Sequence, residues 1–307
     1  MSEISGDILS EASDGFRAGF VALVGRPNVG KSTLLNALVG QKLSIVTPRP
    51  QTTRHRILGL VHRPQLQVAF VDTPGLHQGE RRALNRAMNR TAASALADAD
   101  LVVFVVEALR WTDEDEAVLQ RVKKIGRPAV AVVSKVDKVS PRQRVLPFMA
   151  DLAARHEFLA VVPLSAAKDD NLEALLSVLA KELPESPPLF AEEDVTDRDY
   201  RFRITEIIRE KLTLELNQEV PYGIAVEIER MAEEEGRMVI HAVIWVDREG
   251  QKPIVIGAGG TRLKRVGSSS RREIATLLDR RCHLELWVKV RENWADNAQA
   301  LLKLGLE

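Results

Sequence analysis

The residues from Gly25 to Ser32, GRPNVGKS, follow the pattern G-x-x-x-x-G-K-[ST]. They come directly after an apolar run that predicts a strand and directly before an amphipathic stretch that predicts a helix, which is the context that this pattern requires. Such a loop turns backbone N–H groups toward a phosphate, while its lysine reaches the β and γ phosphates and its hydroxyl binds Mg²⁺. The expected phosphate-binding residues are Gly25, Arg26, Pro27, Asn28, Val29, Gly30, Lys31, Ser32 and Thr33.

A second segment, DTPG at residues 72–75, ends the apolar run VAFVD further along the chain. At the end of a strand, the Asp72 carboxylate would lie beside the phosphate loop and hold Mg²⁺ through water. Gly75 has no side chain, so its N–H can approach a γ-phosphate closely. D-T-P-G alone is a common turn sequence, and its meaning here comes from its place after the phosphate loop.

Two more segments end apolar runs: SKVD at residues 134–137 and SAA at residues 165–167. Open α/β sheets bind their ligands at the carboxyl ends of strands, where both segments fall. Asp137 could accept hydrogen bonds from N1–H and the exocyclic amine of guanine, and adenine lacks this donor pair. Adenine would leave the carboxylate unpaired, which would give selectivity. The expected base site consists of Ser134, Lys135, Asp137, Ser165, Ala166 and Ala167.

These segments lie in a chain where short β-branched runs alternate with helical patterns from Phe20 to Lys181. The alternation predicts an α/β domain with a mostly parallel sheet of about six strands and helices on both faces. After Leu183, a proline-rich and acidic stretch without period predicts a linker. The order helix, two strands, two helices and a strand then predicts a smaller α+β domain. The expected division is a flexible leader at 1–16, the α/β domain at 17–182, the linker at 183–198 and the α+β domain at 199–307.

Composition excludes several classes of protein. The 307 residues carry 43 Lys plus Arg against 43 Asp plus Glu, so binding to nucleic acid or membrane would need a local patch. With 45% hydrophobic and 28% charged residues, the composition is typical of a globular protein and argues against a disordered or fibrous one. The lone Cys282 excludes an internal disulfide, and no apolar run approaches the roughly 18 residues of a membrane span. The six histidines have no ligand spacing, so a zinc site is not expected.

These motifs, together with QTTRH at residues 51–55 and IVIGAGG at residues 254–260, resemble the Era family of translation-associated GTPases. The resemblance runs from about Phe20 to the C-terminus. It implies a P-loop GTPase domain followed by a KH domain of type II, with GTP or GDP and Mg²⁺ as cofactors. It also implies binding to small-subunit ribosomal RNA near its 3′ end and a role in assembly of the 30S subunit. The expected protein is cytoplasmic and monomeric, with peripheral association at the inner membrane face left open.

The resemblance also assigns roles to single residues. Within QTTRH, the family places a threonine on Mg²⁺ and the γ-phosphate, and we favour Thr53 over Thr52. This gives a metal site of Ser32, Thr53 and Asp72, and catalytic roles for Lys31, Thr53 and Gly75. Leu76 stands where many small GTPases carry a glutamine that orients the attacking water, so slow turnover is expected. Asn28 resembles the asparagine with which related GTPases hold K⁺, which makes K⁺ a candidate cofactor.

The turn GAGG at residues 257–260 lies between two helical stretches. In a KH domain such a turn brings the helix ends against about four nucleotides of single-stranded backbone. No acid occurs from Gln251 to Arg272, so a basic groove on a neutral protein fits phosphate contact. A plain helix–helix turn is the competing interpretation. The expected RNA-binding residues are Lys252, Ile256, Gly257, Ala258, Gly259, Gly260, Arg262, Lys264 and Arg265.

Two positions depart from the family pattern. The base site usually reads N-K-x-D, and here Ser134 replaces the asparagine that braces the phosphate loop. A serine hydroxyl is shorter and makes fewer bonds, so nucleotide affinity should fall by about 1 kcal/mol. Ala258 stands where members often carry a basic residue, so Arg262 and Lys264 would have to replace one phosphate contact.

Two functions of other classes stay open at this point. One is an RNA-binding scaffold whose nucleotide site is mainly structural, which multiple-turnover phosphate release would distinguish from an enzyme. The other is a membrane-associated signalling GTPase whose second domain binds protein or lipid. Liposome flotation compared with RNA pulldown would distinguish that function.

Overall fold

The structure is a computed structural model that describes residues 15–49, 52–74, 83–216 and 223–305. Most of the expected leader, the catalytic candidate Gly75 and the neighbouring Leu76 therefore lie outside the described residues. Within the described part of the chain, no helix has the length and apolar character needed to cross a membrane.

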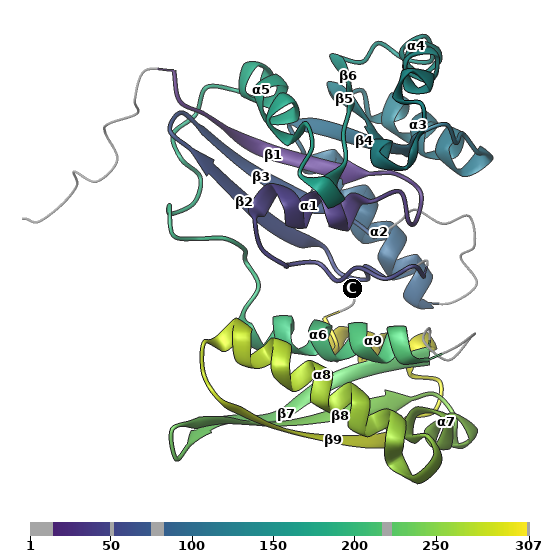
Figure 1. Ribbon diagram of the computed structural model, residues 1–307, viewed down its shortest axis with the longest axis vertical. Helices are drawn as coiled ribbons and strands as arrows, with labels where there is room; N and C mark the ends of the chain where they lie inside the picture. The colour runs from purple at the N-terminus through teal and green to yellow at the C-terminus, as the bar shows by residue number, and fades with distance from the viewer. Residues whose placement is uncertain (1–14, 50–51, 75–82, 217–222, 306–307) are drawn as a thin grey trace, which may run out of the picture.

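The first domain is built on a six-stranded sheet with the order β2-β3-β1-β4-β5-β6 (Figure 1). Strands β1, β3, β4, β5 and β6 run parallel, and β2 is antiparallel to β3. The strands are β1 Arg17–Val24, β2 Ile57–Arg63, β3 Leu66–Asp72, β4 Leu101–Glu107, β5 Ala129–Ser134 and β6 Ala160–Pro163. The mostly parallel sheet predicted from the sequence is confirmed. Its strands are rich in β-branched residues because both faces of a parallel sheet are covered by the helices that connect its strands.

Strand β2 is the strand of this sheet that the sequence pattern did not predict. Gly59 interrupts its apolar run, and strand interiors rarely favour glycine. In the structure a Cβ at Gly59 would lie 2.6 Å from Leu35 Cδ1, so the glycine lets the helix after the phosphate loop pack closely on the sheet.

Helices cover both faces of this sheet (Figure 1). Leucines of α1 Lys31–Val39 and α5 Leu172–Glu182 pack on one face. On the other face pack apolar residues of α2 Ala83–Asp98, α3 Asp113–Ile125 and α4 Val145–Ala153. The carboxyl ends of the five parallel strands consequently meet at one edge, which brings the predicted phosphate, metal and base segments together.

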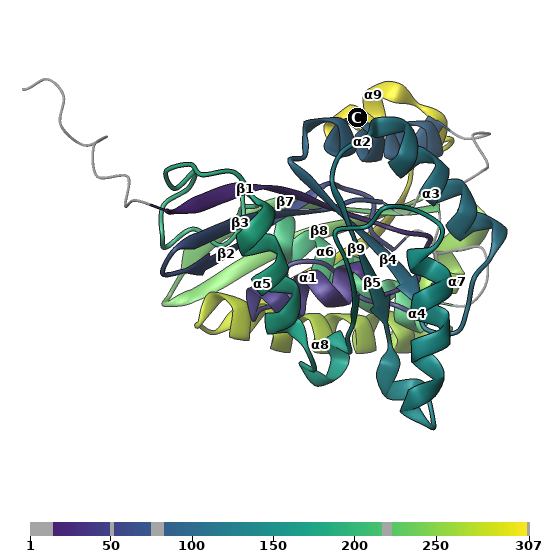
Figure 2. The same ribbon diagram turned by 90° about the horizontal axis from the view of Figure 1, so that it is seen from above.

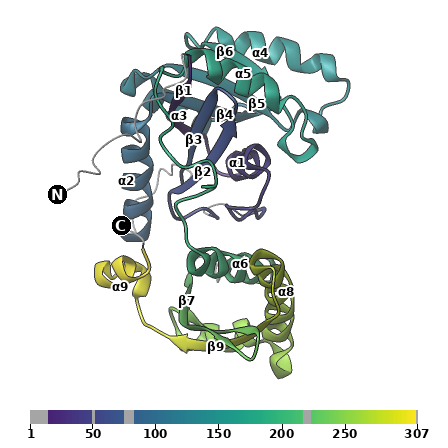
Figure 3. The ribbon, with the colours of Figure 1, turned by 90° about the vertical axis from the view of Figure 1, so that its left-hand side faces the viewer.

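The second domain has three strands in the order β7-β8-β9, with β7 antiparallel and β9 parallel to β8. Helices cover one face of this sheet (Figure 3). The elements are α6 Tyr200–Glu215, β7 Ile224–Glu234, β8 Arg237–Val246, α7 Lys252–Ile256, α8 Thr261–Leu278 and β9 Cys282–Val290. This is the predicted α+β order. The final helix α9 Ala298–Lys303 was not expected, since its six residues are too short to show a helical period.

Helix α2 reaches from the first domain to α9 of the second (Figures 2 and 3). Leu84 and Met88 of α2 pack in one apolar cluster with Ala225, Trp294 and Leu301. The Trp294 ring is fully buried and donates its Nε1–H to the Gly223 carbonyl at 3.1 Å. The two domains therefore share a small core of their own.

Candidate functional site

The phosphate loop joins β1 to α1. Gly25 has φ +155°, and a Cβ there would lie 2.4 Å from the Val105 carbonyl oxygen, so only glycine fits this turn. The Lys31 ammonium is buried and donates to the carbonyl oxygens of Gly25 at 2.9 Å and Arg26 at 3.1 Å. Burial lowers the pKa of Lys31 to about 8, although the nearby Asp72 carboxylate opposes the shift. With a pKa of about 8 the lysine is mostly charged at neutral pH, and a phosphate beside it would favour the charged form further.

The three predicted metal residues meet at the start of α1. Ser32 Oγ donates to Asp72 Oδ2 at 2.7 Å, and Thr53 Oγ1 lies 2.8 Å from Ser32 Oγ. The Ser44 hydroxyl, which sequence reasoning did not find, donates to the same Asp72 oxygen at 2.9 Å. Asp72 is fully buried, and burial raises its pKa despite the charge of Lys31 and the hydroxyl hydrogen bonds.

These residues fit a magnesium ion. Asp72 Oδ1 is buried and has no hydrogen-bond partner in the structure, and a buried carboxylate oxygen of this kind is stabilised by a cation. Hydroxyl and carboxylate oxygens are the ligands that Mg²⁺ prefers, with phosphate oxygens and water completing the shell. Among the described residues, no cluster of three or more His, Cys, Asp and Glu side chains is arranged to hold a metal ion.

The two threonines of QTTRH point to different partners. Thr53 is buried beside Ser32. The Thr52 hydroxyl instead donates to the Arg49 carbonyl at 2.7 Å and lies 2.6 Å from the Thr47 hydroxyl. The geometry therefore favours Thr53 as the residue that can reach a metal.

The base-site residues lie at the ends of β5 and β6. Ser165 Oγ donates to Asp137 Oδ1 at 2.6 Å, which orients an exposed carboxylate. Lys135 has a left-handed backbone, φ 58°, and its ammonium donates to the Asn28 carbonyl of the phosphate loop at 2.6 Å. Ala166 and Ala167 start the short turn after Ser165, so small residues flank the carboxylate.

A cavity of about 420 Å³ extends from the phosphate loop to the turn after β5, where Lys135 and Lys138 line it. The other predicted base-site residues, Ser134, Asp137, Ser165, Ala166 and Ala167, are not among its lining residues. Its walls come from the phosphate loop, from the segment that carries Thr53 and from the turn after β5. They are Pro27, Asn28, Gly30, Lys31, Ser32, Thr33, Ile45, Val46, Thr47, Pro48, Thr52, Thr53, Lys135 and Lys138. The three lysines of this lining, Lys31, Lys135 and Lys138, suit a polyanion.

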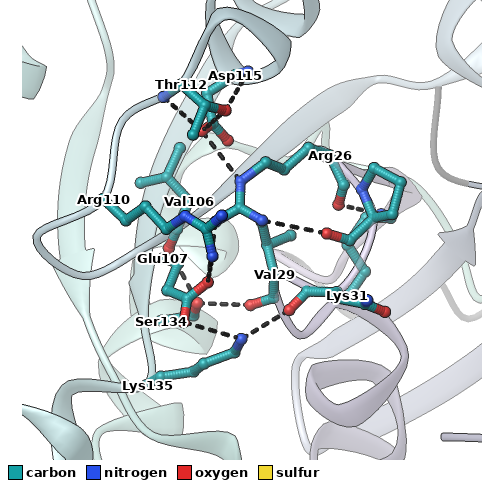
Figure 4. Close-up of polar contacts among 12 residues, drawn as sticks. Arg26, Val29, Lys31, Val106, Glu107, Arg110, Thr112, Asp115, Ser134 and Lys135 are labelled. Atoms are coloured by element: carbon teal, nitrogen blue, oxygen red, sulfur yellow. Dashed lines mark hydrogen bonds and ion pairs between the residues drawn. The ribbon is translucent and has the colours of Figure 1, made fainter. Parts of the chain in front are cut away.

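Ser134 still reaches the phosphate loop in spite of its short side chain. Its hydroxyl lies 2.6 Å from the Val29 carbonyl oxygen and 2.9 Å from that of Val106 (Figure 4). A hydroxyl has one hydrogen, so it cannot donate fully to both carbonyls. Ser134 therefore contacts the phosphate loop, but it has one donor hydrogen where the amide of the family's asparagine has two.

The Arg26 side chain turns away from the cavity. Its Nε lies 3.1 Å from Asp115 Oδ2, and its Nη2 lies 2.8 Å from Glu107 Oε2 (Figure 4). Asp115 is fully buried and belongs to the capping box that Thr112 forms at the start of α3. Arg26 can therefore contribute only backbone groups to a bound phosphate.

Helix α6 of the second domain holds the backbone beside Thr53. Arg209 Nη2 donates to the Thr52 carbonyl, while the same guanidinium binds the Glu206 carboxylate through Nε at 2.7 Å and Nη2 at 2.6 Å. Arg209 and Glu206 are both buried. Burial alone would raise the pKa of Glu206, but the charge and hydrogen bonds of Arg209 lower it.

Further contacts tie the same segment to α6. The Val46 N–H donates to Glu210 at 3.1 Å, and Lys42 pairs with Glu210 and with Glu273 of α8. Arg49 donates to the carbonyl oxygen of Thr213 at 3.2 Å. No local sequence pattern indicates these contacts, because the partners lie more than 150 residues apart.

The GAGG turn has a backbone that requires glycine. Gly257, Gly259 and Gly260 all have positive φ, and a Cβ at Gly257 would lie 2.8 Å from Arg262 Cβ. Ala258 and Gly259 are exposed at the tip. The turn therefore presents backbone at the start of α8, where N–H groups and the helix dipole suit phosphates.

The basic residues around the turn differ in their freedom. The Arg262 guanidinium donates to the carbonyl of Ile254 in the middle of α7, so it connects α8 to α7 across the turn. Arg265 pairs with Glu215 of α6 at 3.2 Å, and Lys264 is exposed.

The other predicted residues of the RNA site lie in α7. Ile256 is half-buried against the core of this domain, and Ile254 is 43% exposed. Lys252, at the start of α7, is half-buried.

Comparisons with known proteins agree with this geometry. Residues 20–135 match the family model described as 50S ribosome-binding GTPase, and residues 219–295 match that of the KH domain. The chain is 47% identical to GTPase Era of Marinobacter nauticus over 300 residues, 98% of each chain. It is 50% identical to GTPase Era of Stenotrophomonas maltophilia over 289 residues, 94% of this chain and 97% of the relative. The chain belongs to the GTPase Era family.

Solved structures of the family have the same architecture. A variant of Aquifex aeolicus Era bound to GDP·AlF4⁻ superposes with a TM-score of 0.92 at 39% identity, covering 95% of this chain and 99% of that one. Era in complex with MgGDPNP and nucleotides 1506–1542 of 16S ribosomal RNA gives a TM-score of 0.92 at 40% identity, with the same coverage. The predicted P-loop GTPase domain followed by a KH domain is confirmed.

Proposed function

We propose that this protein binds and hydrolyses GTP with Mg²⁺, and that its nucleotide state controls binding to single-stranded ribosomal RNA near the 3′ end of the small-subunit RNA during 30S assembly. One observation carries this proposal. Arg209 of the KH domain holds the backbone of Thr52, next to the Thr53 hydroxyl at the metal residues. A movement of Thr53 would therefore be transmitted to the KH domain through the peptide group that joins Thr52 to Thr53.

Each part of the site has a place in phosphoryl transfer to water. Lys31 and the N–H groups of its loop would neutralise the β and γ phosphates, and Ser32 and Thr53 would ligate Mg²⁺, with Asp72 behind them. The ion would neutralise charge on the transferred phosphoryl group. Asp137, oriented by Ser165, would select guanine. Gly75 keeps its proposed contact to the γ-phosphate as an expectation from the sequence.

The switch would act through the segment that carries Thr53. Loss of the γ-phosphate removes one reason for Thr53 to stay beside Ser32. The backbone of Val46 and Thr52 would then be free to move, and α6 would lose its hydrogen bonds to it. By linkage, RNA held by the KH domain would in turn favour one nucleotide over the other.

The small-subunit RNA is the target that the comparisons support best. The description of the GTPase family model names the 50S subunit, but that model matches only residues 20–135 and not the KH domain. The Era complex with 16S nucleotides 1506–1542 aligns with 95% of this chain, including the KH domain. For the KH turn we propose phosphate contacts from backbone groups of Gly257, Gly259 and Gly260, with Lys252, Ile256, Ala258, Arg262, Lys264 and Arg265 around them.

Three finer points belong to the same proposal. Residues 17–182 and 199–307 would act as the GTPase and KH domains, joined by 183–198 after a leader at 1–16. The protein would work as a monomer in the cytoplasm, where subunits are assembled. Asn28, whose amide donates to the Pro48 carbonyl at 3.0 Å, could also face K⁺ beside the phosphates. Equal single-turnover rates in K⁺ and in Na⁺ would remove the potassium role.

The proposal is tested by the affinity for RNA in two nucleotide states. Fluorescence anisotropy of a labelled single-stranded 3′ fragment of the small-subunit RNA is measured with Mg²⁺ and either GDP or a non-hydrolysable GTP analogue. We expect RNA affinity to differ between the two states by about tenfold, since coupling free energies are about 1–3 kcal/mol. Equal affinities would contradict a switch. Liposome flotation under the same conditions tests the membrane-associated alternative, which predicts lipid binding without RNA binding.

A further inference from the structure

The phosphate loop and the base site are joined by a second link beside Ser134. Glu107, the last residue of β4, lies between one cation from each side (Figure 4). Its Oε2 accepts from Arg26 Nη2 at 2.8 Å, and its Oε1 lies 3.2 Å from Lys135 Nζ. The Lys135 ammonium also donates to the Asn28 carbonyl at 2.6 Å. One carboxylate thus contacts the second residue of the phosphate loop and the lysine of the base site at once.

Rigid elements hold this carboxylate in place. The end of β4 is paired with β5, where Glu107 lies opposite Ser134. On its far side Arg26 is fixed by the buried Asp115, which caps α3 together with Thr112. The Arg26 and Glu107 side chains are only 6% and 21% exposed, so water screens their pairing less than it would on the surface.

The two oxygens of Glu107 are both used. Burial alone would raise the pKa of Glu107, but hydrogen bonds from Arg26 and Lys135 lower it. A carboxylate can accept from two cations in this way, whereas a glutamine has one acceptor oxygen and an amide that repels the second cation. An aspartate keeps the charge but is one methylene shorter, so it cannot span the same two partners.

We propose that Glu107 is a positioning residue for the guanine nucleotide, fixing the distance between the phosphate loop and the base site. In this chain it supplies part of the link that an asparagine at position 134 would supply. The inference rests on the proposed nucleotide site. A nucleotide contacts both parts at once, so a fixed distance between them reduces the ordering that binding requires. Glu107 touches neither base nor phosphate in this role, and selection of guanine stays with Asp137.

The test compares Glu107→Gln with the unchanged protein in titrations of fluorescent GDP and ADP. We expect GDP affinity to fall about tenfold, the loss of one charge-assisted contact, while the preference for guanine over adenine is unchanged. Glu157→Gln, the same substitution at an exposed position of the GTPase domain, should bind GDP as the unchanged protein does. No loss of GDP affinity in Glu107→Gln would overturn the inference.

Making Glu107→Gln in both the unchanged protein and the Ser134→Asn variant distinguishes a positioning role of Glu107 from a general structural role. In Ser134→Asn protein the amide can brace the loop, so Glu107→Gln should weaken GDP binding by less than about threefold. An equal loss in both backgrounds would show that the two links are independent, and would overturn the shared role.

Glu107→Asp gives a second test that keeps the charge. Its GDP affinity should fall between that of the unchanged protein and that of Glu107→Gln, and affinity equal to the unchanged protein would refute the two-partner geometry. If the unchanged protein failed to bind GDP, the proposed function would fall. If it binds and the Glu107 variants bind equally well, only this inference fails.

Discussion

The contact from Arg209 to the Thr52 carbonyl predicts that the KH domain supplies part of the affinity for triphosphate. Replacing Arg209 alone would strand the buried Glu206 charge, a loss of about 3–5 kcal/mol that would obscure the result. The informative variant is therefore the double change Glu206→Gln with Arg209→Met, since a buried ion pair is often replaced by neutral residues at little cost. The unchanged protein is the control, because Glu206→Gln alone would leave the buried Arg209 charge unpaired in the same way.

The magnitude follows from one hydrogen bond. A bond from a charged donor contributes about 1.5–3 kcal/mol, and about 1.4 kcal/mol corresponds to a tenfold change in affinity. Thr52 precedes Thr53, whose hydroxyl is positioned for Mg²⁺ and the γ-phosphate. Loss of the contact should therefore weaken binding of a non-hydrolysable GTP analogue by about tenfold or more, while GDP affinity changes by less than about twofold.

The assay is competition of the GTP analogue and of GDP against a fluorescent nucleotide, with Mg²⁺ present, for the double variant and its control. A selective loss for the triphosphate supports coupling through α6. Equal losses for both nucleotides would refute the reasoning, because they would place the effect in the common part of the site. No loss for either would show that the contact does not hold the segment.

Three other perturbations have defined outcomes. Asp137→Asn should weaken GDP binding about tenfold to a hundredfold, since a charged acceptor is lost, and competition titrations that found no change would remove Asp137 from base recognition. The lowered pKa of Lys31, about 8, predicts that GDP affinity is constant below pH 8 and falls toward tenfold per pH unit above it, because only the protonated lysine pairs with phosphate. Calorimetry across pH 7 to 9 checks this, and Lys31→Arg, which stays charged, should give a flat profile. Gly259→Asp should repel RNA in the anisotropy assay, while Gly259→Asn, which also tolerates the φ of +57°, should retain most of the affinity; equal RNA binding by both would contradict backbone contact at the turn.

The parts of the site foreseen from sequence are those whose chemistry lies in contiguous residues. The phosphate loop is one, because its glycines, Lys31 and Ser32 act within eight residues. Parallel strands then explain why Asp72 and Asp137 arrive at the same sheet edge. The order of elements in the KH domain was likewise readable, since each strand alternates and each helix has its own period.

The parts not foreseen depend on contacts between distant segments. Ser44 carries no local sign that its hydroxyl would reach Asp72, and Arg209 lies in a helix whose charged residues suggest only a solvated face. Glu107 is a single acid at the end of an apolar strand. Besides the nearby Arg110, at 4.0 Å, it pairs with Arg26, 81 residues before it, and with Lys135, 28 residues after it. Position 134 was foreseen as a weak brace, but the second link through Glu107 is apparent only in three dimensions.

The most direct test of the account is isothermal titration of the purified protein with GDP and with ADP, each in the presence of Mg²⁺. The account predicts one GDP per chain and ADP binding weaker by at least about a hundredfold, because adenine leaves the Asp137 carboxylate without its donor pair. Equal heats for the two nucleotides, or no heat with GDP, would contradict it.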